Sequence, residues 1–287
     1  MRECLSTMTA IKLTNAATKS CIATTPTPVA TALASPAVTI SMQTVYIAGR
    51  YNKYSKELSQ TPWMLNGVLK TPHSVLSRME SHFLTATKCS SVVFSSSGRE
   101  DVDVRMLGRG RPFVMECVNP KRQMTTAMLS TLQRTVNESC SDMRINDIQV
   151  VTKEETLRNR EDDSDKRKKY LATVTFAEAQ TDDSIKALNE TGEFLIQQQT
   201  PVRVLHRRPL LTRPRMIYAS HLQLTSPFNG LLTLTTQAGT YIKEFCHGDL
   251  GRTVPNLSTF LKCDCDISDL DVADVEMDWP PRIEQDF

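Results

Sequence analysis

SSGREDVDVRMLGRGRPF, residues 96–113, is the stretch on which the interpretation of this chain depends. If it is an extended strand, its side chains alternate between two faces, with valines on one face and Asp101, Asp103 and Arg105 on the other. A solvated surface strand has this pattern. An aspartate that neighbouring arginines keep ionised for catalysis has it too. The stretch alone leaves both interpretations open, so the rest of the chain must decide between them.

The composition is that of a globular protein. The chain has 287 residues, of which 40% are hydrophobic and 23% charged, enough for a large core. It contains no apolar run of about 18 residues that would span a membrane, and no secretory signal. The eight cysteines form no CxxC pair and have no histidine at zinc spacing, so we interpret them as reduced thiols. We therefore expect an intracellular protein, nuclear or cytoplasmic, that holds no metal.

Charge is unevenly distributed along the chain. The net charge is +2, yet residues 262–287 contain nine acidic residues and two basic ones, a balance of −7. The first 261 residues therefore carry +9. Such an excess favours a polyanionic partner, although a moderately basic surface without a ligand has the same composition.

One folded domain, residues 41–287, is expected to follow a tail. Residues 1–40 are rich in Thr, Ala, Ser and Pro and cannot bury enough surface to fold alone, so we predict disorder there. Their shortage of acids also fits an organelle transit peptide, which their shortage of arginine disfavours. Within the domain, thirteen of the seventeen residues 153–169 are charged, which predicts a solvated loop or insertion.

The folded part predicts more strands than long helices. Apolar side chains at helical spacing predict helices over roughly 73–84 and 122–138, and a further helix starts near residue 184. We expect extended segments around residues 45–47, 90–98, 100–107, 111–118, 170–176, 202–208, 216–224 and 231–245. A glycine turn separates the pair at 100–107 and 111–118. Several strands with few long helices indicate the α+β class, a mixed sheet with helices on it.

Two segments have the composition of an RNA-binding surface. AGRYNKYSKELSQTPW (48–63) interleaves cations for phosphates with aromatic rings for stacking, and TPVRVLHRRPLLTRPR (200–215) holds five arginines and no acid. Its prolines argue against a helix and favour an arginine-rich strand and loop. A basic surface of no specific purpose is the alternative. The cations that we expect to contact RNA are Arg50, Lys53, Lys56, Arg203, Arg207 and Arg208.

GREDVDVRMLGRGRPF, with ECVNP at 116–120, resembles the archaeal and eukaryotic pseudouridine synthases that modify the T-loop of transfer RNA. The segments at 48–63 and 200–208 match the same family, as does AGTYIKEFCHGDLGRTVPNL (238–257), in order from about residue 46 to Trp279. The resemblance implies the pseudouridine synthase catalytic fold, α+β with a mixed, largely antiparallel sheet flanked by helices and loops. It also implies an enzyme that isomerises uridine in the tRNA T-arm. We expect a monomer, with other structured RNA as a further partner.

The reaction that the resemblance implies is an internal rearrangement. The C1′–N1 bond of uridine breaks, the uracil turns, and C5 joins C1′. This needs no redox change and no energy donor, so we expect no cofactor and no metal. The sequence leaves open whether the catalytic aspartate attacks C1′ or removes the C2′ proton, and which T-loop uridine is modified.

The family's G-R-x-D core falls on residues 98–101, which makes Asp101 the catalytic candidate. Asp103 then has a structural role, bonded to an arginine or a backbone amide. Because burial alone would neutralise an aspartate, the site needs a paired cation. The resemblance implies Lys243 for that cation, and Arg99 is a second candidate.

Two tyrosines complete the candidate site. In related synthases a lysine–tyrosine pair at the start of a strand places the tyrosine against the target base, and KKYLATV implies Tyr170 for that role. Tyr241, in the block that supplies the paired cation, would line the pocket. The alternative is that both are half-buried strand aromatics.

Other interpretations remain open. The basic segments suit a non-catalytic protein that binds or processes structured RNA equally well, although the aspartate, tyrosine and lysine candidates together favour an enzyme. Residues 263–266 (CDCD) have poor spacing for zinc, so we expect an acidic, solvated edge there. Larger family members carry an N-terminal accessory region with paired CxxC zinc motifs, and only residues 1–40 stand in its place. Either the protein works without that region or the sequence is incomplete.

Overall fold

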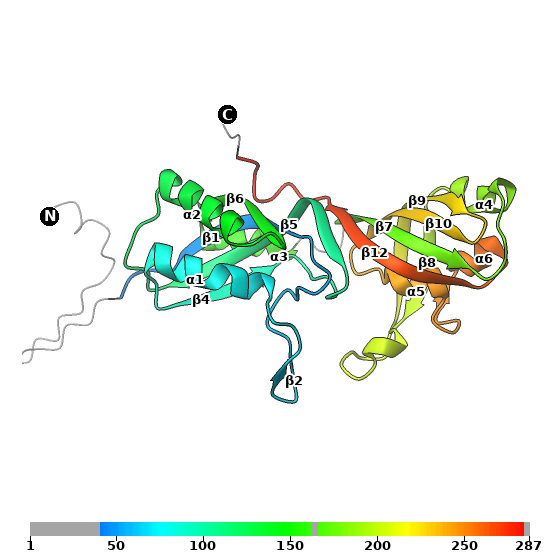
Figure 1. Ribbon diagram of the computed structural model, residues 1–287, viewed down its shortest axis with the longest axis horizontal. Coiled ribbons are helices and arrows are strands. Elements are labelled where there is room, and N and C mark those ends of the chain that lie inside the picture. Colours follow the sequence, from blue (N-terminus) through cyan, green and yellow to red (C-terminus); the bar gives the residue numbers. More distant parts are fainter. Residues whose placement is uncertain (1–40, 162–165, 284–287) are drawn as a thin grey trace, which may run out of the picture.

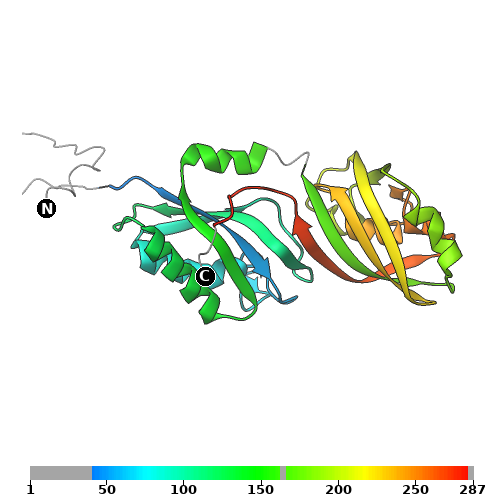
Figure 2. The same ribbon diagram turned by 90° about the horizontal axis from the view of Figure 1, so that it is seen from above.

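One β-sheet runs through the length of the molecule (Figures 1 and 2). The computed structural model describes residues 41–161 and 166–283, and the predicted tail at 1–40 lies outside the described residues. The strands of the sheet are β1 (Val45–Lys53), β4 (Ser91–Ser96), β5 (Arg105–Val118), β6 (Met143–Val151), β7 (Arg167–Phe176), β8 (Phe194–Gln199), β9 (Thr212–Ser226), β10 (Asn229–Gln237), β11 (Thr253–Val254) and β12 (Cys265–Val275).

The order of the strands divides this sheet into two halves. They follow one another as β11–β8–β9–β10–β7–β12–β5–β1–β6, and β4 pairs with β5 as well. These neighbours run antiparallel except β12 and β5, which form a short parallel ladder that joins Asp271 to Arg105 and Val272 to Met106. We call the strands on the β5 side of this ladder the N-terminal half and those on the β12 side the C-terminal half.

Helices α1 (Val75–Thr87) and α2 (Thr126–Ser139) cover one face of the N-terminal half (Figure 1). In α1 the apolar side chains of Val75, Met79 and Phe83 recur every four residues, and all three are fully buried in the core. The two helices confirm the predictions over 73–84 and 122–138, with their ends a few residues later.

Three shorter helices, α4 (Asp182–Asn189), α5 (Ile242–His247) and α6 (Leu257–Leu261), lie on the C-terminal half. α4 packs on β9, and α5 packs on β12. With the sheet, these helices confirm the predicted α+β class and the mixed, largely antiparallel sheet. In the part of the chain that the structure describes, no helix is long and apolar enough to cross a bilayer.

Two segments extend from the middle of the molecule on one side (Figure 1). The first is the hairpin of β2 (Met64–Leu65) and β3 (Val68–Leu69), whose four side chains are all exposed. The second is the loop 200–211, which contains a short 3-10 helix at Val202–Val204. The prediction of an extended segment at 202–208 is therefore wrong.

Residues 101–104 do not form the strand that their alternation predicted. They make a turn in which the Val104 amide donates to the Asp101 carbonyl at 3.2 Å, and β5 begins directly after it. β5 then continues through both glycines, so the predicted glycine turn is wrong as well. Gly110 has φ +79° and lies so close to β1 that a Cβ would stand 2.6 Å from a backbone oxygen, which only glycine avoids.

Two more segments differ from their predictions. Residues 242–245, the end of a segment expected to be extended, instead belong to α5 (Ile242–His247). Where this helix begins, the side-chain amide of Gln198 on β8 accepts from the Tyr241 amide and donates to the Tyr241 carbonyl, both at 2.9 Å. The charged stretch at 153–169, expected to be a loop, contains α3 (Lys153–Glu161) and the start of β7.

Candidate active site

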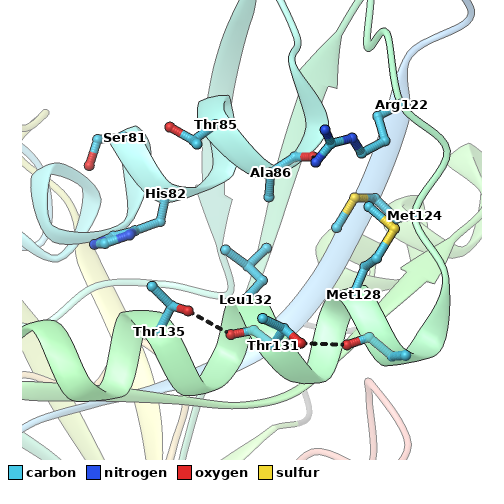
Figure 3. A pocket seen from close by; sticks show the side chains of 11 residues that line it. Ser81, His82, Thr85, Ala86, Arg122, Met124, Met128, Thr131, Leu132 and Thr135 are labelled. Carbon is cyan, nitrogen blue, oxygen red and sulfur yellow. Dashed lines mark hydrogen bonds between the residues drawn. The ribbon is translucent and has the colours of Figure 1, made fainter.

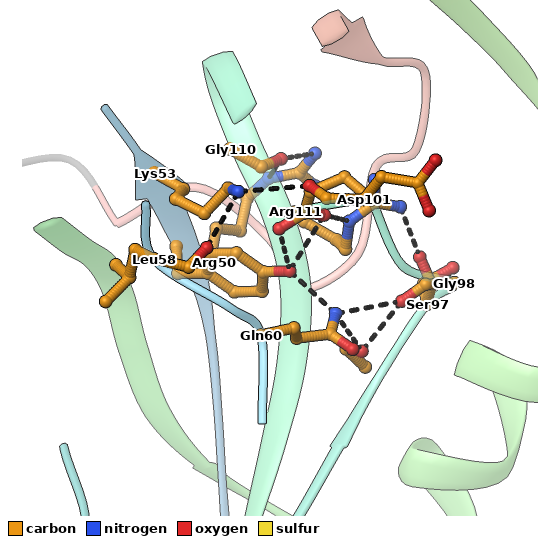
Figure 4. A network of polar contacts seen from close by, with 12 residues as sticks. Arg50, Lys53, Leu58, Gln60, Ser97, Gly98, Asp101, Gly110 and Arg111 are labelled. Carbon is orange, nitrogen blue, oxygen red and sulfur yellow. Dashed lines mark hydrogen bonds and ion pairs between the residues drawn. The ribbon is translucent and has the colours of Figure 1, made fainter. Parts of the chain in front are cut away.

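The turn that carries Asp101 rests on a buried polar network (Figure 4). Glu100 is 6% exposed and accepts hydrogen bonds from Arg111 Nε at 2.7 Å and from the Tyr51 hydroxyl at 2.9 Å. Burial alone would lower the pKa of Arg111, but the Glu100 carboxylate, together with Tyr51 and Tyr170, raises it above its usual value. Gln60 adds a hydrogen bond to the Gly98 carbonyl at 3.1 Å. Glu100 is held toward the core, and the side chain of the next residue, Asp101, faces outward to the cavity.

The outward carboxylate of Asp101 meets two cations from the C-terminal half. Arg203 Nη1 lies 2.9 Å from Asp101 Oδ2, and Lys243 Nζ lies 3.9 Å from the same oxygen. Arg203 also donates from Nε to Glu244 at 2.7 Å, and Glu244 is buried in α5. The side chain of Asp101 is 38% exposed and ion-paired at the same time.

Lys243 bonds more closely to the second aspartate of the turn. Its Nζ stands 2.6 Å from Asp103 Oδ2. Burial tends to raise the pKa of Asp103, but the hydrogen bond and charge of Lys243, with smaller contributions from a backbone hydrogen bond and from Lys53, together hold that pKa below its usual value. The Lys243 ammonium thus lies near both carboxylates. Its positive charge offsets the repulsion between two acids that are only two residues apart.

Asp101, Arg203 and Lys243 border a cavity of about 290 Å³. Tyr170 of β7 and Tyr241 at the start of α5 line it together with Asp101, and Arg203 lies over the Tyr241 ring at 5.9 Å from its centroid. Burial raises the pKa of Tyr170 to about 12, so its hydroxyl stays protonated at neutral pH. The fold brings together residues that lie far apart in the sequence, including the predicted aspartate, both predicted tyrosines and the predicted lysine.

Arg99 borders the cavity but is exposed and, among the residues that the structure describes, makes no ion pair with Asp101. Arg203, which we expected to contact RNA, occupies that position instead. Sequence patterns gave no sign of this, because the segment 200–215 contains no acid. The sequence also gave no sign that Glu244 is a second partner of Arg203, because Glu244 lies outside this segment. Arg207 and Arg208 are exposed at the same cavity.

The prediction that Arg50 contacts RNA is wrong. The residue is 0% exposed, and its guanidinium donates to backbone carbonyls of β5 and of the segment 275–279, among them Gly110 at 2.8 Å and Met277 at 2.9 Å. A side chain enclosed in this way cannot reach a phosphate. It ties the end of the chain to the N-terminal half.

Lys53 is also buried, at 0% exposure, and the prediction that it contacts RNA is wrong for the same reason. Its three hydrogen bonds all go to backbone carbonyls. Lys56 is half-buried and ion-pairs with Asp269 and, at 3.7 Å, with Asp271. The cations of the segment 48–63 therefore bind neighbouring parts of the protein and do not form an exposed basic surface. Two of its aromatic residues, Tyr54 and Trp63, are exposed.

A larger cavity of about 600 Å³ lies between α1 and α2, away from the aspartates (Figure 3). Met124, Met128 and Leu132 give it an apolar lining. The hydroxyls of Thr131 and Thr135 are bonded to backbone carbonyls of their own helix. Because it has no carboxylate beside a cation, this cavity offers no equivalent of the Asp101 site.

Within residues 41–161 and 166–283 no three His, Cys, Asp or Glu side chains gather as metal ligands do. The predicted acidic edge at 263–266 has two exposed aspartates, Asp264 and Asp266, but Cys263 and Cys265 are buried free thiols.

Comparison with known proteins identifies one family. A family model described as "Pus10, C-terminal" matches residues 46–276. The human tRNA pseudouridine synthase Pus10 is 46% identical over 241 residues, which are 84% of this chain and 46% of the human one. The protein of the same name from Picrophilus torridus is 37% identical over 243 residues, 84% of this chain and 61% of that relative. The chain thus spans about half the length of the curated relatives it matches. One chain of a solved Cbf5–Nop10–Gar1 complex is 16% identical over 79% of this chain and 48% of that one with a TM-score of 0.40, a likeness too weak to support a conclusion.

Proposed function

The chain belongs to the Pus10 C-terminal family, and we propose that it is a tRNA pseudouridine synthase that acts on a uridine of the T-loop. The names of its relatives support the reaction class. The observation that carries the proposal is the Asp101 carboxylate, which faces a cavity beside Tyr170 and Tyr241 and is paired with cations.

In this reaction one ionised carboxylate acts on the ribose of the uridine. Asp101 either attacks C1′ or removes the C2′ proton, and in both routes the C1′–N1 bond breaks. C5 of the turned uracil then bonds to C1′, while the Asp101–C1′ bond breaks in the first route or Asp101 returns the proton to C2′ in the second. The C5 proton leaves and N1 gains a proton. Atoms and electrons balance within the nucleotide, so the reaction consumes nothing.

The ion pairs of Asp101 help to keep its carboxylate ionised. When RNA covers the cavity and water leaves, a lone carboxylate would take up a proton. Arg203 at 2.9 Å and Lys243 at 3.9 Å oppose that by stabilising the anion. Lys243 also remains bonded to Asp103, so it keeps its place if RNA phosphates draw the arginine away.

The surroundings of the cavity suit a nucleotide flipped out of its stack. Extrusion loses base stacking, and an aromatic ring returns roughly 1–3 kcal/mol per base. We assign this role to Tyr241 and to Tyr170, which is 9% exposed, because both line the cavity. Exposed Arg207 and Arg208 at the rim are available for phosphates.

The test is chemical mapping of pseudouridine in tRNA T-arm transcripts incubated with the purified protein. Asp101→Asn should abolish conversion while tRNA affinity stays within a few fold, because an amide cannot act as nucleophile or base here. Asp183→Asn, at an exposed position on α4, is the matched control and should convert at the normal rate. Appreciable conversion by Asp101→Asn would contradict the assignment. Binding without any conversion by the unmodified protein would favour a non-catalytic RNA-binding protein.

A further inference from the structure

Lys53 uses its whole hydrogen-bonding capacity on the backbone around the catalytic candidate. It is the last residue of β1, and its Nζ donates to the carbonyls of Leu58 at 2.9 Å, Asp101 at 3.2 Å and Val102 at 2.7 Å. An ammonium has three N–H donors, and all three are engaged. Burying a charge is unfavourable unless it is compensated, so a fully buried lysine needs a reason to be there.

Apart from the bonds of Lys53 and the ion pairs that the side chains of Asp101 and Asp103 make with Arg203 and Lys243, the other polar side-chain contacts of the turn at 98–104 lie at its beginning. Arg111 donates to the Ser97 carbonyl at 2.8 Å and binds the Glu100 carboxylate, and Gln60 binds the Gly98 carbonyl. In the middle of the turn, the Asp101 carbonyl also accepts from the Val104 amide inside the turn. Lys53 links that middle to the sheet and to the 54–63 segment.

We propose that Lys53 is a positioning residue, which holds the backbone of Asp101 from the buried side while the carboxylate faces the cavity. Figure 4 shows the ammonium on the side of the turn opposite the carboxylate. Lys53 thus touches neither the carboxylate nor the cavity, and it acts on the reaction through the backbone of Asp101. Displacing a reacting group by about 1 Å can cost about 100-fold in rate.

The charge of Lys53 is sensitive to mildly alkaline pH. Burial lowers the pKa of Lys53 to about 8. The carboxylates of Glu100, Asp103 and Asp101 oppose this shift and the guanidinium of Arg111 adds to it. As pH rises through this value the ammonium becomes an amine, which has two N–H donors for three carbonyls. The hydrogen bonds by which Lys53 holds the backbone of the turn should therefore weaken above about pH 8.

The activity test rests on the proposed function. Lys53→Met should lower the single-turnover rate at saturating tRNA by about 100-fold, with tRNA affinity within a few fold. Lys53→Arg keeps a charge at all accessible pH values, so it should recover part of that rate and hold it at pH 9, where the unmodified protein declines. Lys186→Met, on the surface of α4, controls for loss of one charge. Val136→Ala, in the core of α2, controls for lost stability.

Amide hydrogen exchange tests the same idea without any activity. In Lys53→Met the peptide 98–106 should lose protection, whereas a β10 peptide stays protected and Val136→Ala changes neither peptide selectively. If the unmodified protein forms no pseudouridine, the proposed function fails and exchange still decides the role of Lys53.

Several results would overturn the proposal. One is a folded Lys53→Met protein with unchanged exchange at 98–106. Another is a rate per folded molecule equal to that of the unmodified protein, which would make Lys53 merely structural. If Lys53→Met does not fold, the unmodified protein is examined from pH 7 to 10. Protection factors at 98–106 should then fall above about pH 8, and constant protection would reject the proposal.

Discussion

Asp101 and Asp103 show how two identical side chains in one turn take different roles. Asp101 faces the cavity and is paired with Arg203, whereas Asp103 is 64% exposed and bonded to Lys243. The difference lies in the direction of each side chain rather than in the local sequence. Lys243 lies 2.6 Å from Asp103 and 3.9 Å from Asp101, so its ammonium can stabilise charge on both.

At this scale the removal of Lys243 is the sharpest test. Lys243→Met should cut the single-turnover rate by about 100-fold or more, because a preorganised charge at a reacting group is worth several kcal/mol. tRNA affinity should change by only a few fold. Rapid-quench pseudouridine assays and filter binding measure the two quantities. Lys262→Met, at an exposed position, is the control and should leave rate and affinity unchanged. If Lys243→Met lowers the affinity for tRNA and not the rate, Lys243 is an RNA contact only.

At the scale of elements, the loop 200–211 carries cations of two kinds. Arg203, in the 3-10 helix, is 38% exposed and bridges Asp101 to Glu244. Arg207 and Arg208 remain exposed at the rim of the cavity. One basic segment therefore supplies both a partner of the proposed catalytic carboxylate and two exposed cations that we propose for the RNA backbone.

Substitutions in this loop should separate the two roles. Each phosphate contact adds about 0.9 to the slope of log affinity against log salt, so Arg207→Ala with Arg208→Ala should lower that slope by about 2. The rate at saturating tRNA should stay near normal. Arg203→Ala should instead reduce the rate at saturation. Affinities measured between 50 and 200 mM salt give the slopes, with Arg134→Ala on exposed α2 surface as control. An unchanged slope in the double variant would place the RNA path elsewhere.

At the scale of the whole molecule, the site lies where the two halves of the sheet meet. Asp101 immediately precedes β5, whereas both its cations come from the C-terminal half. The short parallel ladder at this junction is reinforced by Arg105, which binds Asp271 through two hydrogen bonds of 2.8 and 2.6 Å. Arg50 adds a second link by holding the carbonyls of residues 275–279.

The link through Arg50 gives a prediction about stability. Arg50→Met leaves several buried carbonyls without donors, so the free energy of unfolding should fall by about 3 kcal/mol. The salt slope of tRNA binding should not change, because the side chain is enclosed. Denaturant unfolding and salt-dependent binding measure these quantities, and Arg144→Met, exposed on β6, is the control. Unchanged stability together with a reduced slope would restore Arg50 as an RNA contact.

What the sequence by itself determined are the features that depend on neighbouring residues. The spacing of apolar side chains predicted α1 and α2, and the resemblance of residues 98–101 to the family's G-R-x-D core selected Asp101 as the catalytic candidate. Only the tertiary structure decided which groups surround that aspartate. Arg203 is 102 positions away, and its pairing exists because β5 and β12 bring the two halves together. The fates of Arg50 and Lys53 were decided in the same way, because whether a cation meets a phosphate or a buried carbonyl depends on the strands and loops that cover it.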